Sequence, residues 1–142
     1  MNLVKHRKLI FLSLIHNSAN KVFGVTFIYG IDENNKSVEV GKTWLAKDYQ
    51  YTGYNLVFKY YLFKILLESI KLSRVQLKAD AKNLKSVATM KNIGLNYEGK
   101  LFSHKVLKGS QVRDTEIFSV TQNTWLSIEK FILAKLSKRF VI

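Results

Sequence analysis

The sequence predicts a mixed α/β fold in a single domain, with the element order β-β-β-α-β-α-β-β-α. Three apolar runs near the N-terminus are joined by short polar turns, which is typical of an antiparallel meander. A long apolar helix then connects the third run to a further strand, and such a crossover makes a parallel pair. With 142 residues, 47% of them hydrophobic, the chain is long enough to bury one sizeable core.

The first half of the chain supplies four strands and one helix. Strands are expected at residues 8–16, 21–31, 37–46 and 74–79, and one long helix at residues 53–70. The turns between the first three strands are rich in Asn and Asp, which tolerate left-handed backbone geometry. Gly24 and Gly30 are expected to mark weak points or bulges in the second strand.

The second half supplies two helices around a hairpin. A helix is expected at residues 83–92, with Asn83 as its N-cap and Gly94 as its stop. Strands at residues 97–107 and 113–120 flank a hairpin turn at 108–110. A closing amphipathic helix is expected at 121–139. Its apolar face includes Trp125, Ile128, Phe131, Ile132 and Leu136.

The charge balance points to an anionic ligand or partner. The formal net charge is +13, which favours a phosphorylated cofactor, nucleic acid or an acidic protein. The alternative is that the lysines only form a solvated surface. The basic residues are spread along the whole chain without an arginine-rich run, which argues against a dedicated nucleic-acid-binding protein. There is no cysteine, which excludes disulfides and thiolate sites.

The N-terminal residues only superficially resemble a signal peptide. A basic run at residues 5–8 precedes an apolar stretch at 9–15, but that stretch is short and no small-residue cleavage site follows. A buried strand explains it better. No segment approaches the length of a transmembrane helix, so we expect no membrane partner and a cytoplasmic location.

The turn at residues 48–55 lies where the predicted sheet changes from antiparallel to parallel pairing. Ligands of open α/β sheets bind at such a switch point, at the carboxyl ends of the strands. The helix that begins near Gly53 presents free backbone N–H groups there, which suit a phosphate or pyrophosphate. The helix that begins at Asn83 starts at the same place. The alternative is an ordinary connection with a helix cap.

Two motifs in register on this framework resemble a known family. Residues 50–55 (QYTGYN) are similar to the Q/R-x-x-G-x-G/A phosphate loop of the GNAT superfamily of acyl-CoA-dependent N-acetyltransferases. Residues 80–86 (DAKNLKS), with Gly94, Glu98 and Gly99 after them, resemble the D-x-x-N-x-x-S … G … E-G run of its RimJ/RimL-like branch. Residues 113–115 (RDT) and Trp125 resemble the end of that branch. The resemblance covers residues 9–136.

The resemblance implies an enzyme that moves an acetyl group directly from acetyl-CoA to a primary amine, either a protein N-terminus or a small molecule. It also implies that the chain begins just before the second strand of the family. The GNAT domain at residues 1–142 would then lack the usual first strand and helix pair, which form one wall of the acceptor pocket. Asn55 replaces the last Gly or Ala of the loop, and Leu95 replaces an aromatic residue.

The expected cofactor site follows from the loop and from the resemblance. Backbone N–H groups of the loop would hold the pyrophosphate, and Gly53 would let the backbone approach it. The pantetheine arm would pair with the free edge of the third strand. The expected contacts are Thr43, Trp44, Leu45, Gln50, Tyr51, Thr52, Gly53, Tyr54, Asn55, Asn83 and Ser86. No metal site is expected, because the histidines show no ligand spacing.

Three residues are candidates for catalysis. The resemblance suggests Ser86 as a donor near the leaving sulfur, although it also fits an ordinary first-turn serine. Glu39 is the candidate general base, with a paired surface carboxylate as the alternative. His104 is a second candidate base because imidazole titrates near neutral pH; a solvated or core histidine is the alternative.

Two other functional classes stay open on the sequence alone. One is a catalytically inactive module that binds coenzyme A or a protein partner. The other is a basic domain associated with nucleic acid, which would bind with strong salt dependence. The apolar first strand is expected at an exposed sheet edge. It is therefore a site for pairing with another chain, such as a homodimer partner.

Overall fold

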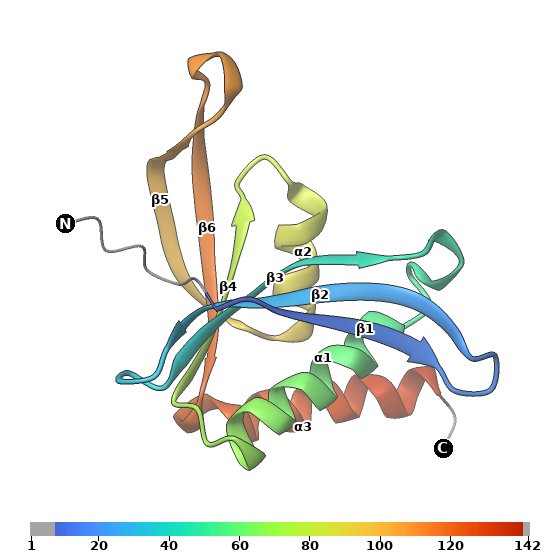
Figure 1. Cartoon of the computed structure of the whole chain (residues 1–142). Helices are drawn as coiled ribbons and strands as arrows, with labels where there is room; N and C mark the ends of the chain where they lie inside the picture. The colour runs from blue at the N-terminus through green and yellow to red at the C-terminus, as the bar shows by residue number, and fades with distance from the viewer. Residues whose placement is uncertain (1–7, 141–142) are drawn as a thin grey trace.

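The computed structural model describes residues 8–140 and has the predicted mixed α/β architecture (Figure 1). One six-stranded sheet has the strand order β1-β2-β3-β4-β6-β5. All neighbouring strands pair antiparallel except β3 and β4, which are parallel. The strands are β1 (Ile10–His16), β2 (Lys21–Asp32), β3 (Ser37–Leu45), β4 (Arg74–Asp80), β5 (Asn96–Val106) and β6 (Val112–Thr121).

Three α-helices pack against this sheet: α1 (Tyr54–Lys64), α2 (Leu84–Ile93) and α3 (Gln122–Arg139). In Figure 1, α1 and α3 lie side by side and α2 lies beside β4. Phe63 of α1 and Ile132 of α3 are fully buried against Val75 of β4 and Phe118 of β6. This continuous apolar core holds α1 and α3 against the sheet.

The long first helix differs from the prediction at its end. We expected one helix through residue 70, but regular α-helix ends at Lys64 and a π-helical segment, Ile65–Ser69, follows. Gln122 of α3 closes this segment, since its side-chain amide donates to the carbonyls of Leu67 and Leu72 at 2.5 and 2.8 Å. An apolar run does not reveal such a change, because a π-helical segment inserts extra backbone without interrupting hydrophobicity.

The caps of the other helices follow their sequence signals. Asn83 is the N-cap of α2, where its Oδ1 accepts a hydrogen bond from the Ser86 amide at 3.1 Å. Gly94 ends α2 in the left-handed conformation. Thr121 caps α3 in a capping box with Thr124. Local sequence therefore determines where α2 and α3 begin, as predicted.

The first strand lies at the edge of the sheet. β1 pairs only with β2, and its side chains Ile10, Phe11 and Ile15 are about half exposed. The position agrees with the expected sheet edge. The prediction of a buried strand is wrong, because only Leu14 of β1 is buried and an edge strand has a neighbour on one side alone. Pairing of this edge with a second chain stays a prediction.

Candidate active site

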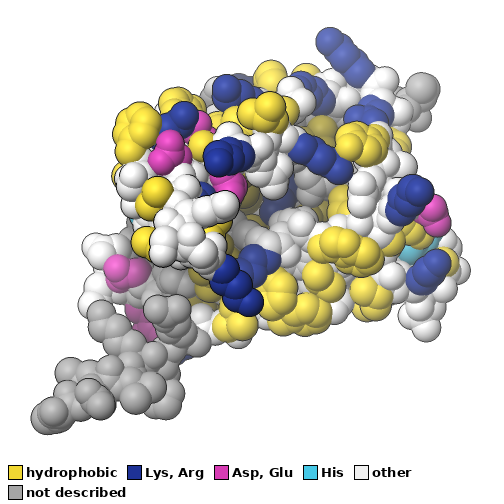
Figure 2. Space-filling model, turned by 90° about the horizontal axis from the view of Figure 1, so that it is seen from above, with side chains coloured by type: hydrophobic (Ala, Val, Ile, Leu, Met, Phe, Trp, Pro, Cys, Tyr) yellow, Lys and Arg dark blue, Asp and Glu magenta, His cyan; other side chains and the backbone are white. Residues whose placement is uncertain are grey.

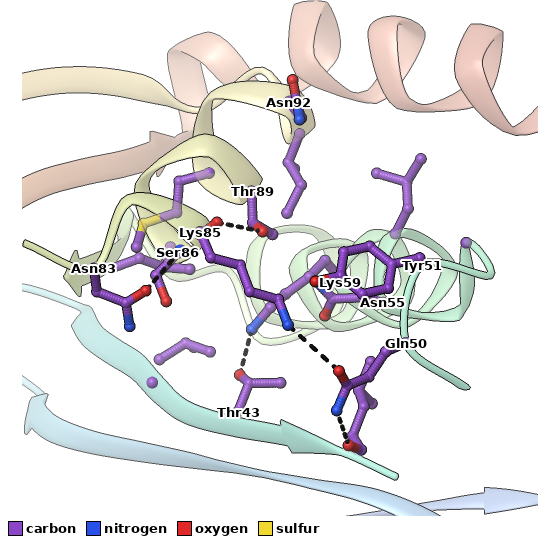
Figure 3. A pocket seen from close by; sticks show the side chains of 18 of the residues that line it. Thr43, Gln50, Tyr51, Asn55, Lys59, Asn83, Lys85, Ser86, Thr89 and Asn92 are labelled. Carbon is purple, nitrogen blue, oxygen red and sulfur yellow. Dashed lines mark hydrogen bonds between the residues drawn. The ribbon is translucent and has the colours of Figure 1, made fainter. Parts of the chain in front are cut away.

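A cleft opens where β3 and β4 part. Their parallel register covers only Ser37 to Glu39 on β3, so the rest of β3 has hydrogen-bonding partners on the β2 side alone. A cavity of about 690 Å³ lies between the separated strands. Its walls come from β3, the turn before α1, α1 itself, β4, α2 and the end of α3 (Figure 3). The predicted switch point is therefore a real opening in the sheet.

A bulge in β3 shapes the floor of this cleft. Phe27 pairs with Gly41 and Val25 with Trp44, so two residues of β3 oppose the single residue Thr26. Lys42 has a left-handed φ of 52° at this point. A bulge bends the strand and redirects its side chains, which is why Lys42 and Thr43 both line the cavity.

The turn before α1 forms one end of the cleft. Gly53 is the N-cap of α1 with a φ of 97°, and no side chain caps this helix end. The left-handed backbone favours glycine here, and a Cβ added at Gly53 would lie 2.9 Å from Cδ of Arg139, so that this side chain would have to move. Arg139 also donates to the carbonyl of Tyr51. The first-turn N–H groups and the positive end of the helix dipole thus face a basic side chain.

Asn55, in the first turn of α1, has an unsatisfied atom in this cleft. Its Oδ1 is buried and has no hydrogen-bond partner, although the residue lines the cavity. Buried polar atoms are normally paired, and an orphaned one indicates a missing ligand or water. The departure from Gly or Ala at this position therefore adds an amide side chain to the cleft wall.

The lining of the cleft is strongly basic. Six basic side chains border it, and none of the described lining residues is Asp or Glu: the basic residues are Lys42, Lys59, Lys78, Lys85, Lys135 and Arg139. On the face seen from above in Figure 2, Lys and Arg outnumber Asp and Glu and border the hollowed centre. Such a cleft attracts anions and holds phosphates well.

A side-chain bridge spans the mouth of the cleft. Nζ of Lys85, on α2, donates to Oε1 of Gln50 at 3.3 Å and lies 4.7 Å from the ring centre of Tyr51. Gln50 is held in turn, because its amide donates to the carbonyl of Leu45 at 3.0 Å. Figure 3 shows Lys85 reaching from α2 toward the turn that precedes α1. The two sides of the cleft are therefore linked through polar contacts.

Lys59 lies inside the cleft and is almost completely buried, with 4% of its surface exposed. Its Nζ donates to Oγ1 of Thr43 at 3.0 Å. Burial lowers the pKa of Lys59 to about 7, because the charged form loses its hydration. A helix residue in an apolar run thus places a titratable amine beside the bulged strand (Figure 3).

The structure brings most of the predicted cofactor residues to the cleft. Those that line it are Thr43, Leu45, Gln50, Tyr51, Gly53, Asn55, Asn83 and Ser86. Three do not line it. Trp44 is 59% exposed on the bulged strand. Thr52 donates to the Tyr49 carbonyl at 2.6 Å. Tyr54 packs on Phe23, and its hydroxyl meets His16 Nε2 at 3.2 Å.

The catalytic candidates are distributed differently. Ser86 lines the cleft beside the cap of α2. Glu39 does not line it; it accepts from the Tyr29 hydroxyl at 2.8 Å and pairs with Lys78 at 2.9 Å. Lys78 does line the cleft, so Glu39 connects to it through that side chain. Burial and the hydrogen bond to Glu39 raise the pKa of Tyr29.

His104 lies outside the cleft lining. Its Nδ1 lies 2.9 Å from the Thr115 hydroxyl, between β5 and β6. This position is closer to that of a structural histidine than to that of a base acting in the cleft. Its part as a base stays an untested prediction.

Sequence reasoning missed several lining residues. Lys59 carries a recognisable signal, because it is an ionisable residue one helical turn after Asn55 in an otherwise apolar run. Thr89, Lys135 and Arg139 carry none, since α2 and α3 reach the cleft only through the tertiary fold. Arg139 meets Tyr51 across 88 positions of sequence.

Comparisons with known proteins identify the fold. Neither a scan against protein-family models nor a search of curated proteins gave a match. Among solved structures, a GCN5-related N-acetyltransferase from Brucella melitensis is 22% identical with a TM-score of 0.81, covering 88% of this chain and 56% of its own. A provisionally assigned acetyltransferase is 24% identical with a TM-score of 0.82, covering 94% of this chain and 68% of its own.

A mutant of the spermidine N-acetyltransferase SpeG from Vibrio cholerae is similar to this chain as well. It is 16% identical with a TM-score of 0.74, covering 87% of this chain and 70% of its own. The chain therefore has the fold of the GCN5-related N-acetyltransferases, and it spans about 56% of the length of the Brucella protein.

Two further findings concern the described residues alone. Within residues 8–140, no helix is long and apolar enough to cross a membrane. No group of three His, Cys, Asp or Glu side chains in this part of the chain could hold a metal ion.

Proposed function

We propose that this protein is an acetyl-CoA-dependent N-acetyltransferase of the RimJ/RimL-like kind, which moves an acetyl group directly to a primary amine. The observation that carries the proposal is the basic cleft between β3 and β4, closed at one end by the left-handed Gly53 turn. The acetyltransferase fold of its structural neighbours supports the same reaction class.

The residues of the cleft fit coenzyme A. The uncapped start of α1 offers backbone donors for a pyrophosphate, and Arg139 adds a guanidinium beside it. The edge of β3 that β4 leaves free offers backbone groups to an extended diamide such as pantetheine. The buried Oδ1 of Asn55 lacks a partner that a ligand donor would supply. When bound, acetyl-CoA supplies an activated acetyl group as a thioester.

The protein then has two tasks at the reacting atoms. It must orient a neutral amine toward the thioester carbonyl, and it must help the thiolate leave. Ser86 is the proposed donor to the sulfur, because its hydroxyl lies on the cleft wall. Glu39 is the proposed base, acting through water or after release from Tyr29 and Lys78, which now occupy its oxygens.

A calorimetric titration of acetyl-CoA into the purified chain tests the cofactor site. Wild-type protein should bind, and Gly53→Glu should lose binding, because it puts a carboxylate where the pyrophosphate would lie. Gly109→Glu is the matched control: Gly109 also has a positive φ, but an added Cβ there meets nothing within 4 Å. A folded wild-type chain that does not bind acetyl-CoA would refute the proposal.

Turnover is tested separately, by release of free coenzyme A with a panel of amines. The panel should include peptides with free N-termini and polyamines, since the acceptor is one of the proposed amine classes. Ser86→Ala and Glu39→Gln should each slow release about 100- to 10,000-fold if they serve as acid and base. Binding without turnover for any amine would favour the inactive coenzyme A-binding module instead.

A further inference from the structure

Lys59 is the one buried lysine among the described residues, and it has no acidic partner. Its Nζ contacts the Thr43 hydroxyl at 3.0 Å, and no carboxylate of residues 8–140 forms an ion pair with it. A buried ammonium without a counter-ion is strongly disfavoured, and lysine responds by becoming neutral. The surroundings of Lys59 thus favour the neutral form of this primary amine.

One arrangement of the hydroxyl hydrogens around Thr43 leaves the lone pair of this amine free. In it, the Thr26 hydroxyl donates to the carbonyl of Gly41 at 3.3 Å and accepts in its 2.8 Å contact with Thr43, where either hydroxyl can be the donor. The Thr43 hydroxyl donates in that contact and accepts from Lys59. Lys59 therefore uses one N–H in this chain, and its lone pair takes no part in it.

No neighbouring charge opposes the neutral form. The titratable groups that line the cleft with Lys59 are Lys42 of β3, Lys78 of β4, Lys85 of α2, Lys135 and Arg139 of α3, and Tyr51 of the turn. All the charged ones are cations, so none of them stabilises a further positive charge at Nζ. The one contact that favours the charged form is with the Phe58 ring, whose centre lies 5.1 Å from Nζ. The pKa of about 7 for Lys59 agrees with this geometry.

We propose that Lys59 is itself an acyl acceptor, which takes the acyl group from an acyl-CoA bound in the cleft and becomes an Nε-acyl-lysine. The inference rests on the proposed acetyl-CoA site. The Nζ lone pair attacks the thioester carbonyl carbon, an N–C bond forms and the C–S bond breaks. The sulfur leaves as a thiolate and takes the proton that the amine loses, giving free coenzyme A.

The modification would be an end product and not an intermediate. An amide is far less reactive toward a second amine than a thioester, so the acyl group would stay on Lys59. The acylated side chain would occupy space in the cleft that the ligand uses. Self-acylation would therefore inactivate the protein when acyl-CoA is present and no external amine is. The inactivated fraction would grow with the time of exposure to acyl-CoA.

The experiment incubates the purified full chain with acetyl-CoA and follows acetylation by intact mass and by mapping of proteolytic peptides. Lys59 should gain one acetyl group at pH 7 at least about tenfold faster than the exposed Lys42 and Lys85, which line the same cavity. A lysine with an ordinary pKa is neutral about a thousandfold less often at that pH, and the lower nucleophilicity of a weaker base offsets only part of the difference. The Lys59→Met variant should lose one acetyl group from its total.

The pH profile and a competitor separate this reaction from chemical acetylation. The rate at Lys59 should level off above about pH 7, whereas the rate at exposed lysines should keep rising. Excess free coenzyme A should slow acetylation of Lys59 and leave that of the exposed Lys108, which lies outside the cleft lining, unchanged. Equal labelling of Lys42 and Lys59, with no effect of the competitor, would overturn the inference.

The inference and the proposed function can fail separately. If calorimetry shows acetyl-CoA binding but Lys59 stays unmodified after prolonged incubation, the self-acylation is wrong and the cofactor site stands. If acetyl-CoA does not bind to the folded chain, both are wrong.

Discussion

Replacing Lys59 with methionine should stabilise the protein at neutral pH, and the gain should vanish in alkali. Burial lowers the pKa of this lysine from 10.5 to about 7. At pH values between about 7 and 10.5, Lys59 is protonated in the unfolded chain and mostly neutral in the folded chain. The free energy of unfolding of the wild type therefore rises with pH across this range. A shift of about three and a half units corresponds to roughly 5 kcal/mol at most.

Methionine keeps the length and apolar body of the lysine side chain and has no charge to bury. Below about pH 7 the variant should be more stable by up to about 5 kcal/mol, less about 1 kcal/mol for the lost hydrogen bond to Thr43. The difference should shrink toward zero by about pH 10. Urea unfolding of both proteins from pH 6 to pH 10 measures it, since the titrations of other groups cancel between variants. A stability difference that stays constant over this range would refute the buried, neutral lysine.

Three further predictions concern single positions. Gly53→Ala should lower the free energy of unfolding by about 1–3 kcal/mol, because the left-handed φ and the close approach of Arg139 both oppose a Cβ. Thermal unfolding measures the loss. Gly109→Ala is the control, because there only the left-handed φ opposes a Cβ, so the difference between the two variants gives the effect of the Arg139 contact. Arg139→Gln should weaken acetyl-CoA binding about tenfold at low salt and less at high salt, while the exposed Lys138→Gln should change little; equal effects would assign the loss to net charge. Thr121→Ala should cost about 0.5–2 kcal/mol in urea unfolding by removing the capping box of α3, and an unchanged midpoint would contradict it.

The fold was predictable because its signals are local. Polar turns separated the strands of the meander, and Asn83 and Gly94 marked where α2 begins and ends. The loop at Gly53 was predictable for the same reason, as glycine before an apolar helix is a local signal. The change from α- to π-helix at Ile65 was not, because apolar residues continue through it.

The cleft was only partly predictable because two of its walls come from distant sequence. Arg139 reaches the Gly53 turn from the last helix, and the sequence near residue 139 does not predict that contact. Trp44 shows a different limit. The bulge at Lys42 interrupts the alternation of side chains between the two faces of β3. The face on which Trp44 lies therefore cannot be predicted by counting residues from the start of the strand.

Several departures from locally stable choices lie in this cleft, although five other non-glycine residues with a positive φ and the buried Nε of Arg113, which has no hydrogen-bond partner, lie outside its lining. Lys42 and Tyr51 hold left-handed backbones that cost non-glycine residues free energy, Asn55 has an orphaned buried oxygen, and Lys59 is buried without a counter-ion. All four line the same cavity. A chain selected only for stability would place smaller or apolar residues there, and proteins tolerate such departures mainly at functional sites. The cost of Lys59 alone is comparable with a large part of the stability of an ordinary domain, about 5–15 kcal/mol. A bound anionic thioester would relieve two of these departures together, since it offers a donor to Asn55 and an electrophile to the amine of Lys59.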